Sequence, residues 1–145
     1  MRQETVNVYK FEELPEKVQQ KLIDEHRYTI VENEDWWQYI ADEIEGLGGN
    51  LIEFDVNKEI IKIDIDYPID FAKAIVSHHG KDCNTYILSE DFINGEISGK
   101  EYVKAISQEY LLALRGEYDY LTDSYFVKHE LFDLNRDYLE DGRPV

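Results

Sequence analysis

The stretch from Ser98 to Leu121 constrains this chain most, because it carries the longest helical pattern in the sequence. Its apolar and aromatic side chains recur every three or four residues, which places them on one face of a helix. The members of this stripe are Val103, Ile106, Tyr110, Leu114, Tyr118, Leu121 and Tyr125. Ser98 followed by Glu101 is typical of a capping box at a helix start. We therefore expect a long central helix over about residues 100–121.

The clearest strand signal lies in residues 51–66, where apolar and polar side chains alternate. Ile52, Phe54 and Val56 alternate with Glu53 and Asp55 in the first half of this stretch. In the second half, Ile61, Ile63 and Ile65 alternate with Lys62, Asp64 and Asp66. Asn57 and Lys58 between the halves predict a β-hairpin over about 51–66. One face of an antiparallel sheet can pack on helices while the other stays polar.

Shorter patterns complete the first half of the chain. Residues 5–11 alternate and predict an N-terminal strand of the same sheet. A helix is expected from Pro15 to about Arg27, since proline is tolerated in a first helical turn. A second helix, capped by Asn33, would contain the adjacent residues Trp36 and Trp37. The glycine pair at 48–49 would end it.

The second half of the chain predicts further helices around the long one. Asp70 is expected to cap a helix that stops at Gly80. Residues 81–99 predict a further helical turn at 82–88 and a short helix capped by Ser89. After a break at 122–124, a helix should run through Leu134, and residues 137–145 could close as a strand that joins the sheet.

These elements predict an α+β fold: a small antiparallel sheet (hairpin about 51–66 plus the N-terminal strand) packed against several helices, with a long central helix. A length of 145 residues indicates a single globular domain over 1–145. Hydrophobic residues make up 43% of the chain, which argues against disorder.

Acidic residues dominate the charge. The chain holds 32 Asp and Glu against 15 Lys and Arg, a formal net charge of −17. A compact chain of this length is about 38 Å across, and duplex DNA of that length carries about 22 charges. Direct binding to nucleic acid or to an anionic membrane is therefore not expected. A basic protein is the natural partner.

Cys83 is the single cysteine, which excludes an internal disulfide and suits a reducing compartment. The first residues carry no apolar run typical of a signal peptide, and no stretch reaches membrane-spanning length. We therefore expect a cytoplasmic protein.

Two metal sites can be drawn from the sequence. His78, His79 and Cys83 form one cluster, but adjacent helical histidines diverge by about 100° and a structural zinc site needs four ligands. Asp64, Asp66 and Asp70 could present oxygens to a hard cation, but no glycine-bearing calcium loop accompanies them. A histidine at a helix C-terminus and a solvated strand face explain these residues better. We expect neither metal nor cofactor.

Catalytic patterns are weak. Cys83 could act as a nucleophile with His79 as its base if both lay on one helix. A small cysteine side chain in the core is the commoner arrangement. No phosphate-binding loop, nucleophile elbow or dinucleotide fingerprint is present. We therefore expect no enzymatic activity and assign no catalytic residue.

Several segments resemble a group of small acidic proteins of bacteriophages and prophages. The segments are VYKFEELPEKVQQKLIDEHR followed by DWW, then HHGKDCNTY, EYLLALRGEYDYLTDS and the closing YLEDGR. Members of this group are mostly uncharacterised, and some carry antitoxin-like labels. The resemblance implies a phage origin, a bacterial host cytoplasm and a host-directed or accessory role. It supplies no catalytic residues.

These observations predict a non-enzymatic phage-type protein whose carboxylates bind a basic host protein. The partner would be a nucleic-acid-binding protein of a host defence system, which the chain would inhibit as a nucleic-acid mimic. The expected acidic surface comprises Glu53, Asp55, Asp64, Asp66, Glu109, Glu117, Asp119 and Asp123. Three alternatives stay open: an antitoxin-like neutraliser of a basic toxin, a small enzyme of unknown substrate, and a protein whose charge serves only solubility.

Overall fold

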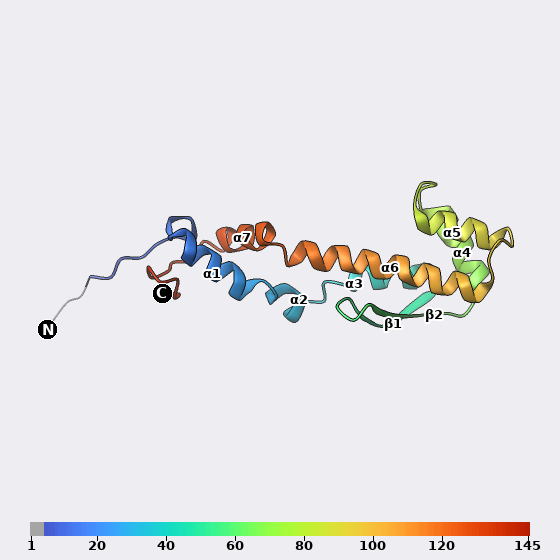
Figure 1. The fold of residues 1–145 in the computed structure, drawn as a ribbon, viewed down its shortest axis with the longest axis horizontal. Helices are drawn as coiled ribbons and strands as arrows, with labels where there is room; N and C mark the ends of the chain where they lie inside the picture. Colours follow the sequence, from blue (N-terminus) through green and yellow to red (C-terminus); the bar gives the residue numbers. More distant parts are fainter. Residues whose placement is uncertain (1–4) are drawn as a thin grey trace. The chain divides into compact units, whose positions relative to one another are not determined.

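The computed structural model describes residues 5–145 and has an α+β fold, as the sequence predicts (Figure 1). The described residues form helices and one antiparallel pair of strands, and the long helix is α6 (Gly99–Leu121). The chain divides into two compact units. Unit 1 contains the residues up to Glu34 together with Tyr118–Val145, and unit 2 is Asp35–Glu117. The single domain over 1–145 expected from the sequence stays a prediction.

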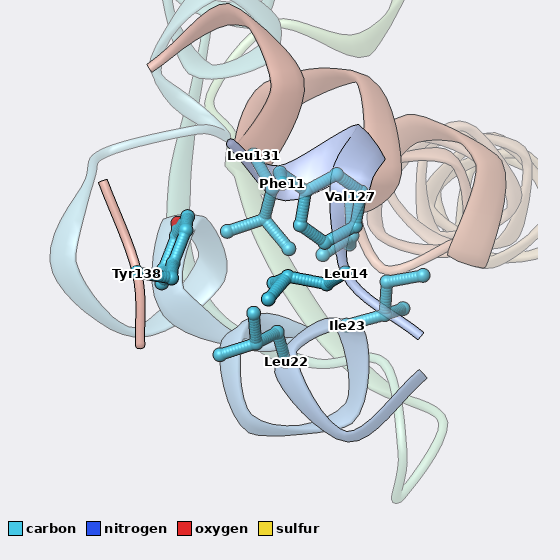
Figure 2. Packing of buried hydrophobic residues seen from close by; sticks show 7 residues of the cluster. All are labelled: Phe11, Leu14, Leu22, Ile23, Val127, Leu131 and Tyr138. Atoms are coloured by element: carbon cyan, nitrogen blue, oxygen red, sulfur yellow. The ribbon is translucent and has the colours of Figure 1, made fainter. Parts of the chain in front are cut away.

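Unit 1 is built from helices that enclose a small apolar core. It contains the 3₁₀ turn η1 (Phe11–Glu13) and the helices α1 (Glu16–His26), α2 (Thr29–Asn33) and α7 (Ser124–Asp133). Figure 2 shows side chains from η1, from the residue that follows it, and from α1 and α7 pointing toward one another, together with one from the C-terminal segment. They are Phe11, Leu14, Leu22, Ile23, Val127, Leu131 and Tyr138.

The N-terminal strand predicted over residues 5–11 is absent. Val6 and Val8 are 60% and 49% exposed, so their alternation faces no core. The backbone instead forms one isolated bridge, in which Tyr9 and Tyr138 exchange two N–H···O=C bonds of 2.8 Å. The C-terminal strand was also expected in the sheet, and this expectation is wrong as well. Tyr138 pairs with Tyr9 and Pro144, not with the hairpin.

The first helix and the break before α7 are confirmed. Pro15 immediately precedes α1, which ends at His26. The neighbouring Arg27 donates to the carbonyl of Thr122 at 2.8 Å and to Ser124 Oγ at 3.0 Å, so it ties the end of α1 to the start of α7. Asp123 caps α7 by accepting a hydrogen bond from the Tyr125 amide. Tyr125 was expected on the apolar stripe of the long helix, but it lies in α7 and is 72% exposed.

Unit 2 opens with a shorter helix than predicted. α3 spans Gln38–Gly46, and Asn33 ends α2 rather than capping α3. Trp36 and Trp37 therefore lie in the turn before α3, where both rings pack on Phe54, with ring centroids 5.7 and 6.1 Å away. The two tryptophan side chains would diverge on a helix, but in this turn both contact Phe54. The glycine stop is confirmed, because Gly48 adopts a left-handed φ of +103°.

The hairpin is confirmed, with one irregularity. β1 (Gly49–Asp55) pairs antiparallel with β2 (Ile60–Ile65). A β-bulge between Leu51 and Glu53 inserts Ile52 as an extra residue. Leu51 and Phe54 consequently share the inner face, and Ile52 is 53% exposed instead of buried as its alternation suggested.

Two helices between the hairpin and α6 begin elsewhere than predicted. α4 (Pro68–His78) starts with Pro68 in its first turn, so Asp70 lies inside the helix and does not cap it. α5 (Asn84–Ile93) is one helix that packs against α4. Ser89, expected as a cap, sits in the middle of α5 and is fully buried.

The long helix α6 starts as predicted. Ser98 Oγ accepts a hydrogen bond from the Glu101 amide at 3.2 Å. Its buried side chains follow the predicted three- and four-residue spacing, widened by their neighbours. They are Tyr102, Ile106, Ser107, Tyr110, Leu111 and Leu114.

Candidate protein-binding surface

Four of the predicted acidic residues lie on the hairpin, and the register places them on one side. Glu53 is paired with Lys62 and Asn50 with Asp64, and residues two apart on a strand share a face. Asp55 lies on the same face as Glu53, and Asp66 continues the alternation just beyond β2. Glu53, Asp64 and Asp66 are exposed, while Asp55 is half-buried. The outer face of the hairpin, defined by these four acids, therefore surrounds Lys62 with carboxylates.

The Asp55 side chain also stabilises the turn of the hairpin. Its Oδ1 accepts hydrogen bonds from the amides of Asn57 and Lys58, at 2.9 and 3.0 Å. These bonds close the turn between the strands, which contains Glu59 in a left-handed conformation with φ of 57°. A partner that binds Asp55 would therefore meet a carboxylate whose position is already fixed by the turn.

The other four predicted acids are distributed along α6 and the α6–α7 junction. Glu109 and Glu117 are half-buried and belong to unit 2, whereas Asp119 and Asp123 are exposed and belong to unit 1. Glu117 accepts a hydrogen bond of 3.2 Å from the Tyr39 hydroxyl. Burial, followed by the Glu117 charge, raises the pKa of Tyr39. The eight predicted acids thus fall on two units, and the structure brings only the hairpin group together on one demonstrated face.

The negative charge is shared by both units. Residues 35–117 hold 17 acids and 7 bases, a net charge of −10. The residues of unit 1 hold 15 acids and 8 bases, a net charge of −7. Each unit is therefore acidic on its own, and neither is a neutral scaffold for the other.

Sequence reasoning missed a group of buried polar side chains in unit 2. Ser89 of α5 and Tyr102 of α6 share a hydrogen bond of 2.7 Å between their hydroxyl groups. Both side chains are fully buried. Burial raises the pKa of Tyr102 to about 12, and the Ser89 bond opposes that rise. Nothing in the sequence pattern distinguishes Ser89 from a solvent-facing serine, because the pairing depends on how α5 and α6 pack.

Tyr110 and His79 carry the remaining buried polar atoms. The Tyr110 hydroxyl makes no hydrogen bond of ordinary geometry in the part of the chain described. Burial, and then the charge of Glu43, raises the pKa of its phenol. The same Glu43 places a carboxylate oxygen 3.4 Å from His79 Nε2, a separation of ion-pair range if the imidazole is protonated. His79 Nδ1 lies 2.6 Å from Thr85 Oγ1.

These contacts remove the geometric basis for a Cys83–His79 catalytic pair. α4 ends at His78, and Cys83 precedes α5, so the two residues are not one turn apart on a helix. The two ring nitrogens of His79 face Thr85 and Glu43 instead. Cys83 is exposed, contrary to the expectation of a small buried side chain. Within residues 5–145 no group of three or more His, Cys, Asp or Glu residues is arranged to hold a metal ion.

Surface grooves occur in both units. In unit 1 a groove of about 460 Å³ is lined by the aromatic residues Phe11, Tyr125 and Phe132 together with polar and charged residues. In unit 2 a groove of about 550 Å³ lies between β2 and the first half of α6. A second one, of about 380 Å³, lies between the hairpin turn and the second half of α6. The volumes fall in the range of sites that bind small ligands or peptide side chains.

No family model, curated protein or solved structure matches the chain. The resemblance to small acidic phage proteins therefore stays a prediction. Across the described residues, no helix has both the length and the apolar character needed to cross a membrane.

Proposed function

We propose that this chain is a non-enzymatic binding protein whose hairpin outer face captures a basic protein. The observation that carries the proposal is the register of β1 and β2, which gathers Glu53, Asp55, Asp64 and Asp66 on one side. Residues 49–66 carry five acids and two bases, so the hairpin is acidic apart from the rest of unit 2. The two bases, Lys58 and Lys62, reduce this charge without reversing it.

A rigid display of carboxylates suits recognition of a basic surface. Directly opposed residues of antiparallel strands have Cβ atoms about 5 Å apart, and residues two apart on a strand are about 7 Å apart. Carboxylates held at such spacings meet several lysine or arginine groups without first paying to order a flexible loop. The net charge of −17 adds long-range attraction, which speeds encounter with a cationic partner and weakens with salt.

The narrower form of the proposal is nucleic-acid mimicry against a host defence protein. Under this form the carboxylates occupy the positions that phosphates take on the partner's binding surface. The phage origin implied by the sequence resemblance supports this form, and the total charge, close to that of duplex DNA of the same length, supports it too. Capture of the partner should then compete directly with DNA.

The test is affinity capture from a bacterial lysate with matched variants. The wild type should retain a basic protein at low salt and release it at high salt. The pair Glu53→Gln and Asp64→Asn should abolish capture. The pair Glu32→Gln and Glu34→Gln, which removes the same charge from exposed positions of unit 1, should preserve it. Equal loss with both pairs would show that only total charge matters and would refute the hairpin as the binding face.

A second step tests mimicry. Duplex DNA added to the captured complex should displace the chain if both occupy one surface on the partner. Retention of the chain at saturating DNA would reject mimicry while leaving protein binding intact.

A further inference from the structure

The groove between β2 and α6 has only basic residues among its charged lining residues, although unit 2 is strongly acidic. Its lining includes Lys62, Lys100 and Lys104, and no Asp or Glu side chain contributes to it. Unit 2 has seven basic residues against 17 acids, so nearly half of its bases surround this one groove. Chance placement of lysines on such a surface would interleave them with carboxylates. The groove therefore has three ammonium groups and no carboxylate among its lining residues, although Glu53 and Asp64 flank Lys62 on the outer face of the hairpin.

The three lysines are not engaged elsewhere in the described structure. Their ammonium groups form no salt bridge or hydrogen bond with any residue of 5–145. Lys62 faces Glu53 across the hairpin by register, but no ion pair joins them. Lys100 and Lys104 are one helical turn apart and point along the same side of α6. All three are exposed and can reach a ligand without breaking an existing contact.

The groove also borders an unpaired strand edge. The described sheet contains only β1 and β2, so β2 is hydrogen-bonded along one side. No backbone hydrogen bond outside the hairpin ladder involves residues 60–66 in the described chain. Backbone N–H and C=O groups of alternate β2 residues therefore point away from β1, and such an edge is a template for a further strand. Figure 1 shows the hairpin running alongside α6, which forms the other wall of the groove.

Apolar side chains form the rest of the lining. Ile61 and Ile63 come from β2 and Val103 from α6. The neighbouring groove shares Gln108 with this one and contains Leu112, which is 63% exposed. A strand laid along β2 would direct every second side chain toward these apolar groups and the others toward solvent.

We propose that this groove binds an extended acidic peptide segment of a partner protein, which adds to the edge of β2 as a third strand. Carboxylates of the segment pair with Lys62, Lys100 and Lys104, and its alternate apolar side chains pack on Ile61, Ile63 and Val103. The six residues of β2 match a segment of about six residues, or about 20 Å. Lysine on a strand edge discourages pairing with neutral or basic strands. The same lysines select an acidic strand, because its charge is complementary. This site shares Lys62 with the hairpin outer face, but it uses the edge of β2 and the lysines of α6 rather than the four acids.

The probe is a fluorescein-labelled, end-blocked peptide EVEVEV, titrated with the full chain and followed by fluorescence anisotropy. Two control peptides carry the same net charge. EEEVVV has the same composition without alternation, and EVEVEV methylated on alternate amide nitrogens cannot pair with a strand edge. We expect EVEVEV to bind at least about tenfold tighter than either control, since only it can combine carboxylate contacts with strand addition.

Matched variants of the chain locate the site. Lys100→Glu with Lys104→Glu should weaken EVEVEV binding at least about tenfold, because two attractive contacts become repulsive. Lys73→Glu with Lys81→Glu makes the same change of net charge at exposed positions outside the groove and should weaken binding less than about threefold. Backbone amide shifts in an NMR titration should be largest in residues 60–65.

Three results would overturn the proposal. Equal binding of the methylated peptide would show that the edge of β2 is not used. Equal effects of the two lysine pairs would assign binding to bulk charge. If EVEVEV does not bind, and the wild type is a dimer that the Lys100→Glu and Lys104→Glu changes convert to monomer, a second copy of the chain occupies the groove.

Discussion

Two tyrosines of the same helix should respond in opposite ways to loss of the hydroxyl group. Tyr102 and Tyr110 are both buried in α6, at 0% and 3% exposure. The Tyr102 hydroxyl shares a 2.7 Å hydrogen bond with Ser89, whereas the Tyr110 hydroxyl makes no hydrogen bond of ordinary geometry within the described chain and interacts with the Glu43 carboxylate. Tyr102→Phe leaves the buried Ser89 hydroxyl unpaired, which should lower the free energy of unfolding by about 1–3 kcal/mol.

Tyr110→Phe removes a buried hydroxyl that makes no hydrogen bond of ordinary geometry with the described residues. The free energy of unfolding should therefore stay unchanged or rise by up to about 2 kcal/mol. The nearby Glu43 carboxylate loses a dipole in this variant, but its own side chain is 49% exposed and stays hydrated. The two substitutions remove the same atom from the same helix, so helix propensity and lost volume cancel in the comparison.

Urea unfolding followed by tryptophan fluorescence measures the difference. The chain has two tryptophans, both of which pack on Phe54 in unit 2, so the signal reports on the unit that contains both tyrosines. The urea midpoint of Tyr110→Phe should lie at or above that of the wild type, and the midpoint of Tyr102→Phe should lie below it. Replacing both partners, with Tyr102→Phe and Ser89→Ala, should recover part of the loss because no unpaired group remains.

Equal destabilisation by the two tyrosine substitutions would refute this reasoning. It would mean that the Tyr110 hydroxyl makes a hydrogen bond as valuable as that of Tyr102. A changed urea dependence in one variant alone would instead indicate a changed compactness of the denatured or native state, and a second probe such as far-UV circular dichroism would then be compared with the fluorescence.

Other outcomes follow from the glycines, from Tyr102 ionisation and from the net charge. Gly142→Ala should lower the free energy of unfolding of unit 1 by about 1–3 kcal/mol in thermal unfolding, because its Cβ would lie 2.9 Å from Val18 Cγ1 at a φ of +90°. Gly116→Ala in unit 2, whose Cβ would meet nothing within 4 Å, should raise the free energy of unfolding of that unit by about 0.5–1 kcal/mol through helix propensity, and a lower value would contradict the open geometry. Burial raises the pKa of Tyr102 to about 12, so its neutral form stabilises the fold below pH 10 and that contribution is lost as the pH rises toward 12. The urea midpoint of the wild type should consequently fall more steeply over this range than that of Tyr102→Phe, and parallel curves would argue against the shift. Because the net charge is −17, the urea midpoint should rise as NaCl is increased from low concentration to about 0.5 M, and a flat response would show that self-repulsion is negligible.

Local patterns predicted the elements whose signals are complete within a few neighbouring residues. The spacing of apolar side chains in α6 and its Ser98 cap depend on contacts inside one or two turns, and both are confirmed. The hairpin at 49–65 follows from alternation and its turn in the same way. The predictions failed where a distant partner decides the outcome. Residues 5–8 alternate like a strand but have no strand to pair with, and a bulge moved Ile52 to the outside.

The same distinction between local and long-range information applies to the eight predicted acidic residues. Alternation alone placed Glu53, Asp55, Asp64 and Asp66 on a polar strand face, and the bulged register of β1 and β2 keeps them together. The acids of α6 and of its junction with α7 were grouped by sequence distance only, and they fall on different units. Whether the eight bind a partner stays a prediction.

The sequence by itself determined the charge of this protein, its long helix, its hairpin and the polar side of that hairpin, since each depends on composition or on short-range periodicity. Tertiary structure alone decided which polar groups are buried and which basic groups converge. Ser89 bonds to Tyr102 because α5 packs on α6, and Lys62, Lys100 and Lys104 line one groove because β2 lies beside α6. The physical reason is that periodicity gives the direction of a side chain relative to its own element. Only packing between elements brings groups that are distant in the chain within reach of one another.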